Sequence, residues 1–388
     1  MKRESLIPRP DWPKKMEDLG FSFHSIDGIY WDERACYAFT ADEIDTLEEA
    51  TAGLHEMCLE TVDGVVTAGD YQHFAIPDAF VALVEQSWRY KENEKENEKK
   101  NEREKSLFGR FDFSWDGRSP PKMLEYNADT PTALIEASVA QWYWMQEVKP
   151  DADQFNSLHE KLIARWEVMR EDFPADRIVH FTCVADSEED VGNLDYLRDT
   201  AMQAGLDARF VDIAQIGWNS ATNSFVDAGD LRISVLFKLY PWEWLLRESF
   251  GQNLLKRTVK VIEPAWKMLL SNKAILPMLW QKFPNHPNLL PCFFEPGKFA
   301  TDFVKKPLYS REGANVTIKT DAGEIAVPGD YGAEGFIYQA YHPLPTFSGS
   351  HTVIGSWIVG DEPAGMGIRE DESPVTKNTS RFLPHYFE

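Results

Sequence analysis

The sequence predicts an α/β fold, and three observations point to it. The 388 residues are 43 % hydrophobic and 13 % aromatic, which is enough for one large core or for two or three lobes. Strand-like and helix-like segments alternate between residues 177 and 244. Residues 108–127 show the two-residue period that is typical of paired strands.

The first ninety residues indicate a helical N-terminal part. A helical apolar pattern opens at Ala41-Asp42-Glu43 and continues to Cys58, and after Pro77 a second helix is expected to end near Trp88. Residues 91–105, KENEKENEKKNEREK, contain no apolar side chain and can bury nothing. They indicate a charged insert, either a solvated helical extension or a disordered segment; the functional alternative is a partner-binding arm.

A βαβ unit is predicted over residues 177–213, with a further strand and helix after it. The expected elements are a strand over 177–183, a helix with Leu194, Leu197 and Met202 on its apolar side, strands over 208–212 and 231–237, and a helix that begins within 240–244. Strands that alternate with helices favour a parallel sheet.

The charge balance excludes several classes of protein. The 40 Lys and Arg residues against 63 Asp and Glu give a net charge of −23, which argues against non-specific nucleic-acid binding. No apolar run approaches the ~20 residues that cross a bilayer, and the first twenty residues lack the apolar segment of a secretory signal. We therefore expect no membrane contact and a cytoplasmic location.

The cysteines agree with that location. Cys36, Cys58, Cys183 and Cys292 lie far apart in the sequence and form no CxxC pair. Free and mostly buried thiols are the expected arrangement.

The densest group of polar residues lies in residues 108–127. Arg110 and Asp112 alternate with aromatic residues, so the two side chains share one face of a strand. After a turn-forming stretch at 116–121, Glu125 and Asn127 alternate in the same way. The pattern predicts a β-hairpin with polar side chains on one face.

The register of this hairpin predicts a cation site. If the hairpin is symmetric about residues 118–119, Asp112 faces Glu125 and Arg110 faces Asn127. Two carboxylates directly opposite each other repel. A divalent cation removes that penalty, and an Asp–Glu–Asn oxygen set suits Mg²⁺. The alternative is a surface hairpin whose acids are solvated.

Two further stretches carry clustered charges. A short strand with Lys305 and Lys306 ends at Pro307, and the turn at 311–315 contains a glycine. A lysine at a strand end that faces a glycine turn suits a phosphate group; the alternative is an ordinary hairpin with solvated lysines. Arg369 lies among acids near the end of the chain.

Taken together, segments along almost the whole chain resemble one family. They include LHEMCLE (54–60), LEYNADTPTALIEA (124–137), FKLYPWEWLLRE (237–248), EPAWKMLLSNKAILP (263–277), KPLYSREGANV (306–316) and GIREDESPVT (367–376). They are similar to the synthetase domain of the glutathionylspermidine synthetase family and to its stand-alone bacterial acid–amine ligases. No amidase domain, which bifunctional members carry, is expected.

The resemblance implies a circularly permuted ATP-grasp fold of the glutathione synthetase type. It also implies an ATP- and Mg²⁺-dependent acid–amine ligase, in which ATP phosphorylates a carboxylate and an amine attacks the acyl phosphate. The partners would be a small-molecule carboxylate and amine, and the charge of −23 favours the approach of a polyamine. The alternative is a nucleotide-binding protein that only hydrolyses or senses ATP.

The resemblance also implies roles for individual residues. Arg110 would stabilise charge on the transferring phosphoryl group, Asp112, Glu125 and Asn127 would bind Mg²⁺, and Thr130, Arg311 and Arg369 would lie on the acid-substrate side. The implied ATP-binding residues are Arg110, Phe111, Asp112, Lys273, Lys306, Gly313, Gln339, Ser373, Pro374 and Val375.

These expectations divide residues 1–388 into five parts. They are a helical part at 1–90, the charged insert at 91–105, a metal-binding hairpin region at 106–170, a βαβ substrate-side lobe at 171–250, and a nucleotide-binding part at 251–388.

Overall fold

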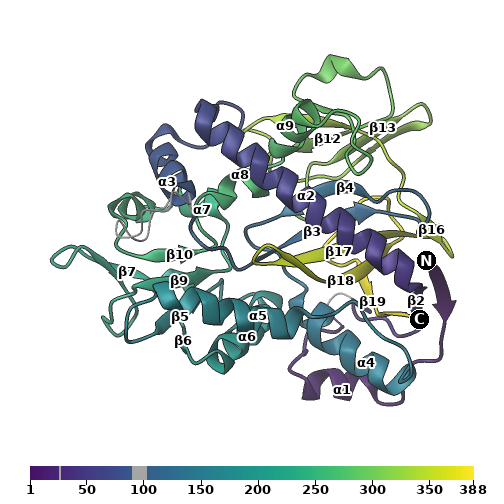
Figure 1. Cartoon of the computed structure of the whole chain (residues 1–388), viewed down its shortest axis with the longest axis horizontal. Helices are drawn as coiled ribbons and strands as arrows, with labels where there is room; N and C mark the ends of the chain where they lie inside the picture. Colours follow the sequence, from purple (N-terminus) through teal and green to yellow (C-terminus); the bar gives the residue numbers. More distant parts are fainter. Residues whose placement is uncertain (26–27, 90–102) are drawn as a thin grey trace.

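The computed structural model describes residues 1–25, 28–89 and 103–388. Within these residues the strands form five sheets, and the fold is mixed α/β as the sequence predicts. Figure 1 shows a central sheet between a parallel sheet at the lower left and a second antiparallel sheet at the upper right. The predicted site residues lie where these three sheets meet.

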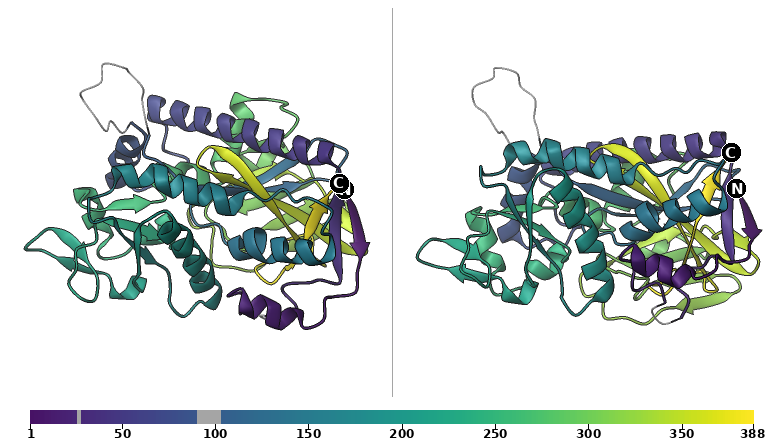
Figure 2. Two further views of the ribbon diagram at one scale, coloured as in Figure 1. Left: turned by 60° about the horizontal axis from the view of Figure 1, so that its bottom comes forward. Right: turned by 90° about the horizontal axis from the view of Figure 1, so that it is seen from below.

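The central sheet is antiparallel, with strand order β19-β18-β17-β3-β4 and β16 paired to β17. Its strands are β3 (Phe108–Ser114), β4 (Lys122–Asn127), β16 (Thr346–Phe347), β17 (Ser350–Val359), β18 (Glu362–Asp371) and β19 (Arg381–Leu383). Helix α2 (Ala41–Ala68) packs on β17 and β18, and both views of Figure 2 show it as an outer layer above the sheet. This helix begins where it does because Thr40 and Glu43 form a capping box.

The parallel sheet has the order β10-β9-β5-β6 and confirms the predicted βαβ unit. Its elements are β5 (Ile178–Thr182), α6 (Glu188–Gln203), β6 (Asp207–Phe210), β9 (Val235–Lys238) and β10 (Lys260–Ile262). The strand expected over 231–237 is wrong in its first half. The Ile233 N–H donates to the Phe225 carbonyl, so that stretch turns back toward the hairpin of β7 (Gly217–Asn219) and β8 (Ser224–Val226).

The second antiparallel sheet, with order β11-β15-β12-β13-β14, carries the predicted lysine strand. Its strands are β11 (Cys292–Phe293), β12 (Phe303–Pro307), β13 (Thr317–Thr320), β14 (Gly323–Ala326) and β15 (Phe336–Ala340). A small sheet joins β1 (Lys2–Ser5), β2 (Ala35–Phe39) and β20 (His385–Phe387).

The remaining helices pack around the sheets. They are α1 (Trp12–Asp18), α3 (Asp78–Trp88), the π-helix η1 (Glu136–Ala140), α4 (Gln141–Val148), α5 (Leu158–Met169), η2 (Arg170–Asp172), η3 (Ile213–Gln215), α7 (Trp242–Leu245), η4 (Gly251–Lys256), α8 (Lys267–Ser271), α9 (Ile275–Lys282) and η5 (Pro296–Lys298). No helix among the described residues is long and apolar enough to cross a bilayer. The four cysteines are buried and free, as expected.

Strand β3 is anchored in the core at its start. Leu107 and Phe108 are fully buried, and their N–H groups donate to the carboxylate of Glu263 at 3.0 Å. The ammonium group of Lys267 contacts that carboxylate at 3.1 Å and donates to the Phe108 carbonyl at 2.7 Å. These buried contacts fix where the strand that carries Arg110 and Asp112 begins.

The charged run at 91–105 is described only at its end, because residues 91–102 lie outside the described part of the chain. The Glu104 N–H donates to the Ser87 carbonyl at 2.9 Å, and Lys105 pairs with Asp172 at 3.0 Å. The guanidinium of Arg103 lies 5.5 Å from the centre of the Trp266 ring. The expectation of a wholly solvated run is therefore wrong for its last three residues, which lead directly into β3.

Candidate functional site

The β3–β4 hairpin has the predicted register at its polar positions. Arg110 pairs with Asn127 and Asp112 with Glu125, and a bulge then shifts the register by one residue. The Asn127 amide nitrogen lies 3.2 Å from Asp112 Oδ2 and 3.4 Å from Glu125 Oε1. Three oxygen-bearing side chains thus converge on one point beside Arg110. Rotating the amide would turn its oxygen toward the same point.

Arg110 of the hairpin and cations from two other segments neutralise the paired carboxylates. Arg110 Nε lies 2.7 Å from Asp112 Oδ1, and Arg369 on β18 approaches Asp112 Oδ2 at 3.6 Å. Lys273, between α8 and α9, contacts Glu125 Oε2 at 3.1 Å. The structure therefore brings Lys273 and Arg369 to the hairpin, which their positions in the sequence alone do not reveal.

The charge of Glu125 is held by its neighbours. Burial raises the pKa of the Glu125 carboxyl, but the ammonium groups of Lys273 and Lys306 outweigh it and lower the pKa to about 2. Glu125 is therefore ionised throughout the physiological pH range and is available as an anionic ligand.

Lys306 and Gln339 form one buried unit. Lys306 Nζ donates to Gln339 Oε1 at 2.8 Å and to the Leu124 carbonyl at 2.9 Å. Lys305 lies on the other face of β12, where its ammonium group is 3.8 Å from the centre of the Phe336 ring. The two neighbouring lysines thus differ as the strand period predicts, and only Lys306 lies beside the hairpin carboxylates.

The glycine turn lies against the segment that follows β18. Gly313 has a φ of 72°, and a Cβ atom at this position would lie 2.5 Å from Val375 Cγ1. Val375 N–H donates to Ser373 Oγ at 3.2 Å, which shapes this second turn. Two stretches that the sequence presents separately are therefore in direct contact, and a larger residue than glycine does not fit between them.

These residues enclose two adjoining pockets. The first, called the strand pocket, is lined by Leu124, Val304, Lys306, Gln339, Pro374 and Val375, among others. The second, called the loop pocket, is lined by Arg110, Asn127, Thr130, Asp190, Arg311 and Arg369, among others. Asp112, Glu125, Gly313 and Thr376 line both. The two carboxylates therefore form a shared wall between the pockets.

Three predicted residues, Phe111, Lys273 and Ser373, line neither pocket, and Phe111 points away from both. The Phe111 side chain is fully buried and stacks on Tyr126, with ring centres 3.8 Å apart. Because neighbouring side chains on a strand alternate between faces, Phe111 lies opposite Arg110 and Asp112. Its side chain belongs to the core and does not reach the strand pocket.

The loop pocket contains contacts that sequence reasoning missed. Arg311 donates to Thr130 Oγ1 at 2.6 Å and pairs with Glu243 at 3.1 Å. Beneath them, Lys238 Nζ and Asp129 Oδ1 form a fully buried ion pair at 2.5 Å. The sequence did contain a signal for this pair, because Lys238 ends the otherwise apolar strand VLFK. A buried lysine is rare unless it is paired, so a partner carboxylate could have been expected.

Asp190 is a further carboxylate that the sequence analysis did not identify. It lies in the first turn of α6 and lines the loop pocket. Burial and the neighbouring Glu189 carboxylate raise the pKa of Asp190 to about 6. A carboxylate with this pKa is ionised near neutral pH and can hold a cation or accept a proton.

Glu136 on the π-helix is buried without a full set of partners. Tyr30 donates to its Oε1 at 2.7 Å, and Oε2 has no hydrogen-bond partner. Burial and the nearby Glu189 raise the pKa of Glu136 to about 8. The native carboxyl is therefore neutral at pH 7.

Replacing Glu136 by glutamine should remove a pH dependence of stability. Between the ordinary pKa of 4.5 and about 8, the native state keeps a proton that the unfolded chain loses, so wild-type stability falls as pH rises. The slope is at most about 1.4 kcal/mol per pH unit. The melting temperature of Glu136→Gln, measured relative to that of wild type, should therefore rise as the pH is raised from 5 to 8. Glu160→Gln, at an exposed position, is the control, and a constant difference would contradict the assignment.

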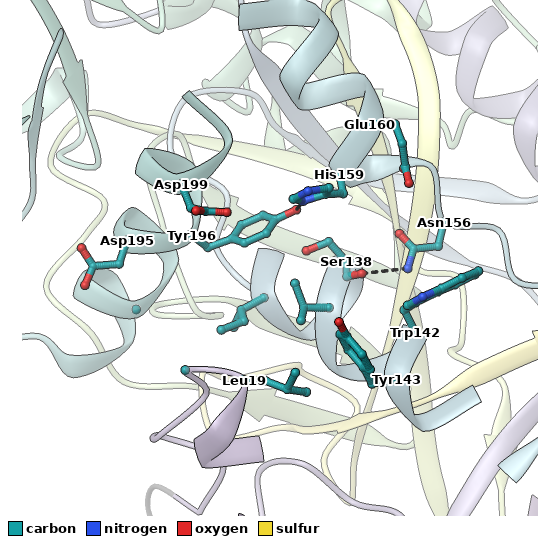
Figure 3. A pocket seen from close by; sticks show the side chains of 14 residues that line it. Leu19, Ser138, Trp142, Tyr143, Asn156, His159, Glu160, Asp195, Tyr196 and Asp199 are labelled. Atoms are coloured by element: carbon teal, nitrogen blue, oxygen red, sulfur yellow. Dashed lines mark hydrogen bonds between the residues drawn. The ribbon is translucent and has the colours of Figure 1, made fainter. Parts of the chain in front are cut away.

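A further pocket lies apart from this site. Figure 3 shows side chains from α4, α5 and α6 around it, with Trp142 and Tyr143 on one side, His159 and Glu160 on a second, and Asp195, Tyr196 and Asp199 on a third. None of the predicted site residues lines it. Most of the predicted site residues line the strand pocket or the loop pocket instead.

Comparison with known proteins agrees with this architecture. Residues 3–388 match the family described as glutathionylspermidine synthase preATP-grasp. A Haemophilus influenzae protein provisionally named acid–amine ligase is 43 % identical, with both chains covered completely. Trypanothione synthetase of Crithidia fasciculata and the bifunctional glutathionylspermidine synthetase/amidase of Escherichia coli are each 27 % identical. The chain spans 53 % and 63 % of the lengths of these two proteins.

The fold has a solved counterpart. A glutathione synthetase-like effector from Globodera pallida superposes with a TM-score of 0.62 at 10 % identity, covering 97 % of this chain and 96 % of its own. The solved structure shows a glutathione synthetase-like fold, and the relatives define an amide-forming ligase. Within that class, the chain belongs to the glutathionylspermidine synthase family.

Proposed function

We propose that the protein is an ATP- and Mg²⁺-dependent carboxylate–amine ligase with a circularly permuted ATP-grasp fold. The observation that carries the proposal is the convergence of Asp112, Glu125 and Asn127 with Arg110 and Lys273 at the wall between two pockets. Phosphoryl transfer requires positioned cations and a metal more than a side-chain nucleophile. A wall shared by two pockets lets a nucleotide on one side face an acid on the other.

ATP would occupy the strand pocket. Apolar side chains of Val304, Val316 and Ile318 suit the adenine ring, and Gln339 offers its amide to the base. Lys306 and Lys273 would contact the phosphates, and the Gly313 turn would cover them. Pro374 and Val375 would close the other side, with Ser373 shaping their turn.

Asp112, Glu125 and Asn127 would hold Mg²⁺. The donor set fits this ion, since it combines two carboxylates and an amide oxygen on adjacent strands and leaves positions for phosphate oxygens. When bound, the ion neutralises charge on the phosphates during transfer. Arg110, held by Asp112 and by the Thr132 carbonyl at 2.7 Å, is positioned to stabilise the transferring phosphoryl group.

The acid and the amine would meet in the loop pocket. Arg311, Thr130 and Arg369 would orient the carboxylate that attacks the γ-phosphate of ATP, which releases ADP and leaves an acyl phosphate. The amine then attacks the acyl carbon and phosphate leaves, giving the amide. Asp190 would hold the amine and accept its proton, because its pKa of about 6 suits proton transfer near neutrality.

The test is a trap for the acyl phosphate. The protein is incubated with Mg-ATP, hydroxylamine and pools of small carboxylic acids, glutathione among them. We expect one acid to give ADP and its hydroxamate in equal amounts, measured by mass spectrometry. ADP release at the same rate with every acid, and without hydroxamate, would instead establish the alternative of an ATPase or nucleotide sensor.

Lys306→Ala should weaken ATP binding strongly. Loss of a charge-assisted hydrogen bond costs about 1.5–3 kcal/mol, which corresponds to an increase in Kd of roughly 10- to 150-fold. Calorimetric titration with a non-hydrolysable ATP analogue and Mg²⁺ measures this change. Lys305→Ala is the matched control, one residue away on the opposite strand face, and should bind as wild type does. Equal affinities for all three proteins would refute the role of Lys306.

A further inference from the structure

The parallel sheet has a crossover point beside the loop pocket. In chain order β5 comes first, β6 follows on one side of it, and β9 then lies on the other side. The crevice at the carboxyl ends of two such strands is the usual ligand position in open α/β sheets. Here it lies between Val184, after β5, and Tyr240, after β9, and the Leu239 N–H donates to the Thr182 carbonyl at 2.7 Å.

An apolar pocket opens at this crevice. It has a volume of about 340 Å³, within the range of small-molecule sites. Most of its lining is aliphatic or aromatic: Ile213, Phe225, Leu236, Phe250, Leu254 and Val259 contribute. Among the described residues that line it, Glu248 alone is charged, and its carboxylate accepts a hydrogen bond from the Tyr240 hydroxyl at 2.7 Å.

The apolar pocket adjoins the loop pocket. Val184 and Tyr240 line both. Val184 is 37 % exposed and Phe250 is 46 % exposed, so the apolar rim faces solvent. Beyond Val184, the loop pocket presents the carboxylates of Asp190 and Glu312. A molecule that spans the boundary therefore meets carboxylates at one end and hydrocarbon at the other.

We propose that the apolar pocket binds an alkyl or aryl group of the amine substrate, so that the acceptor is an amine with an apolar arm. This inference rests on the proposed ligase function. The ammonium group lies near Asp190, and the arm passes between Val184 and Tyr240. An acid suits this boundary less well than it suits the part of the loop pocket beside Arg311 and Arg369, because Asp190, Glu312 and Glu248 repel a carboxylate.

Direct binding of straight-chain amines tests the proposal without turnover. Propylamine, butylamine, pentylamine and hexylamine are titrated by calorimetry into the full chain with Mg²⁺ and a non-hydrolysable ATP analogue. Each added methylene should lower Kd about fourfold. The matching series of n-alkyl carboxylates should show no such trend. A flat amine series, or a trend with the carboxylates instead, overturns the proposal.

Two variants from different segments of the lining locate the effect. Phe250→Asp and Ala214→Asp each place a charge at the pocket and should reduce the trend to less than twofold per methylene. Leu255→Asp, at an exposed apolar position on η4 outside the pocket lining, should keep the fourfold trend. An unchanged trend in both pocket variants overturns the proposal. A trend in wild type without any hydroxamate in the acyl-phosphate trap would reject the ligase function and leave the apolar site in place.

Discussion

Asp112→Asn should reduce acyl-phosphate formation by about 100- to 1,000-fold, the loss that follows removal of one group that stabilises transition-state charge. Asp112 is one of the residues that line both pockets, and it lies opposite Glu125. Arg110 and Arg369 both contact its carboxylate. The asparagine keeps the size and an oxygen acceptor for Arg110 but removes the charge that would hold Mg²⁺. Hydroxamate formation at saturating Mg-ATP measures the effect.

The control for this variant lies on the same hairpin. Asp116 is exposed in the turn and accepts hydrogen bonds from the backbone of Arg118 and Ser119, which asparagine can also do. Asp116→Asn should therefore retain wild-type turnover, and both variants should melt within a few degrees of wild type. Normal hydroxamate formation by Asp112→Asn would rule out its assigned role.

Lys238→Met should destabilise the protein by about 3–5 kcal/mol, the usual cost of leaving one partner of a buried ion pair alone. Lys238 and Asp129 are fully buried, and the second oxygen of Asp129 accepts the Trp242 N–H at 2.9 Å. The pair joins the end of β4 to the end of β9, so its loss should also disturb the loop pocket. Urea unfolding measures the change in free energy.

A double variant separates the buried charge from simple loss of packing. Lys238→Met with Asp129→Asn removes both charges and keeps an acceptor for Trp242, so it should recover part of the lost stability. Lys14→Met, which breaks an exposed pair with Asp18, should change stability by less than about 1 kcal/mol. If the double variant is as unstable as Lys238→Met, the unpaired carboxylate is not the cause.

Local patterns predicted the hairpin almost completely. The alternation of residues 108–127 gave both strands and the facing of Asp112 and Glu125, because strand period and turn chemistry are local properties. The one-residue bulge after Asp112 was not predictable, since it depends on how both strands meet the rest of the sheet. Helix α2 was predicted too short; the apolar pattern continues through Val62 and Val65 and ends before Gly69, which has a positive φ.

Contacts between residues that are far apart in the chain could not be predicted from the sequence. Lys273 reaches Glu125 from the link between α8 and α9, and Arg369 and Asp112 meet across the central sheet. Lys238 and Asp129 meet where the parallel sheet adjoins the end of β4. The family resemblance supplied several of these residues as candidates but not their partners. Glu136 shows the same limit, because its raised pKa depends on a burial that neighbouring residues in the sequence do not reveal.

The position of β3 has a consequence for how the protein is made. This strand pairs with β4, which follows it closely, and on its other side with β17, which begins at Ser350. When the first 349 residues have left the ribosome, Arg110, Asp112 and Glu125 have been synthesised, but β17, which pairs with the free edge of β3, has not. Until then β3 has an open edge, which invites pairing with other chains. We therefore expect nascent or truncated chains to need chaperone protection until β17 is in place.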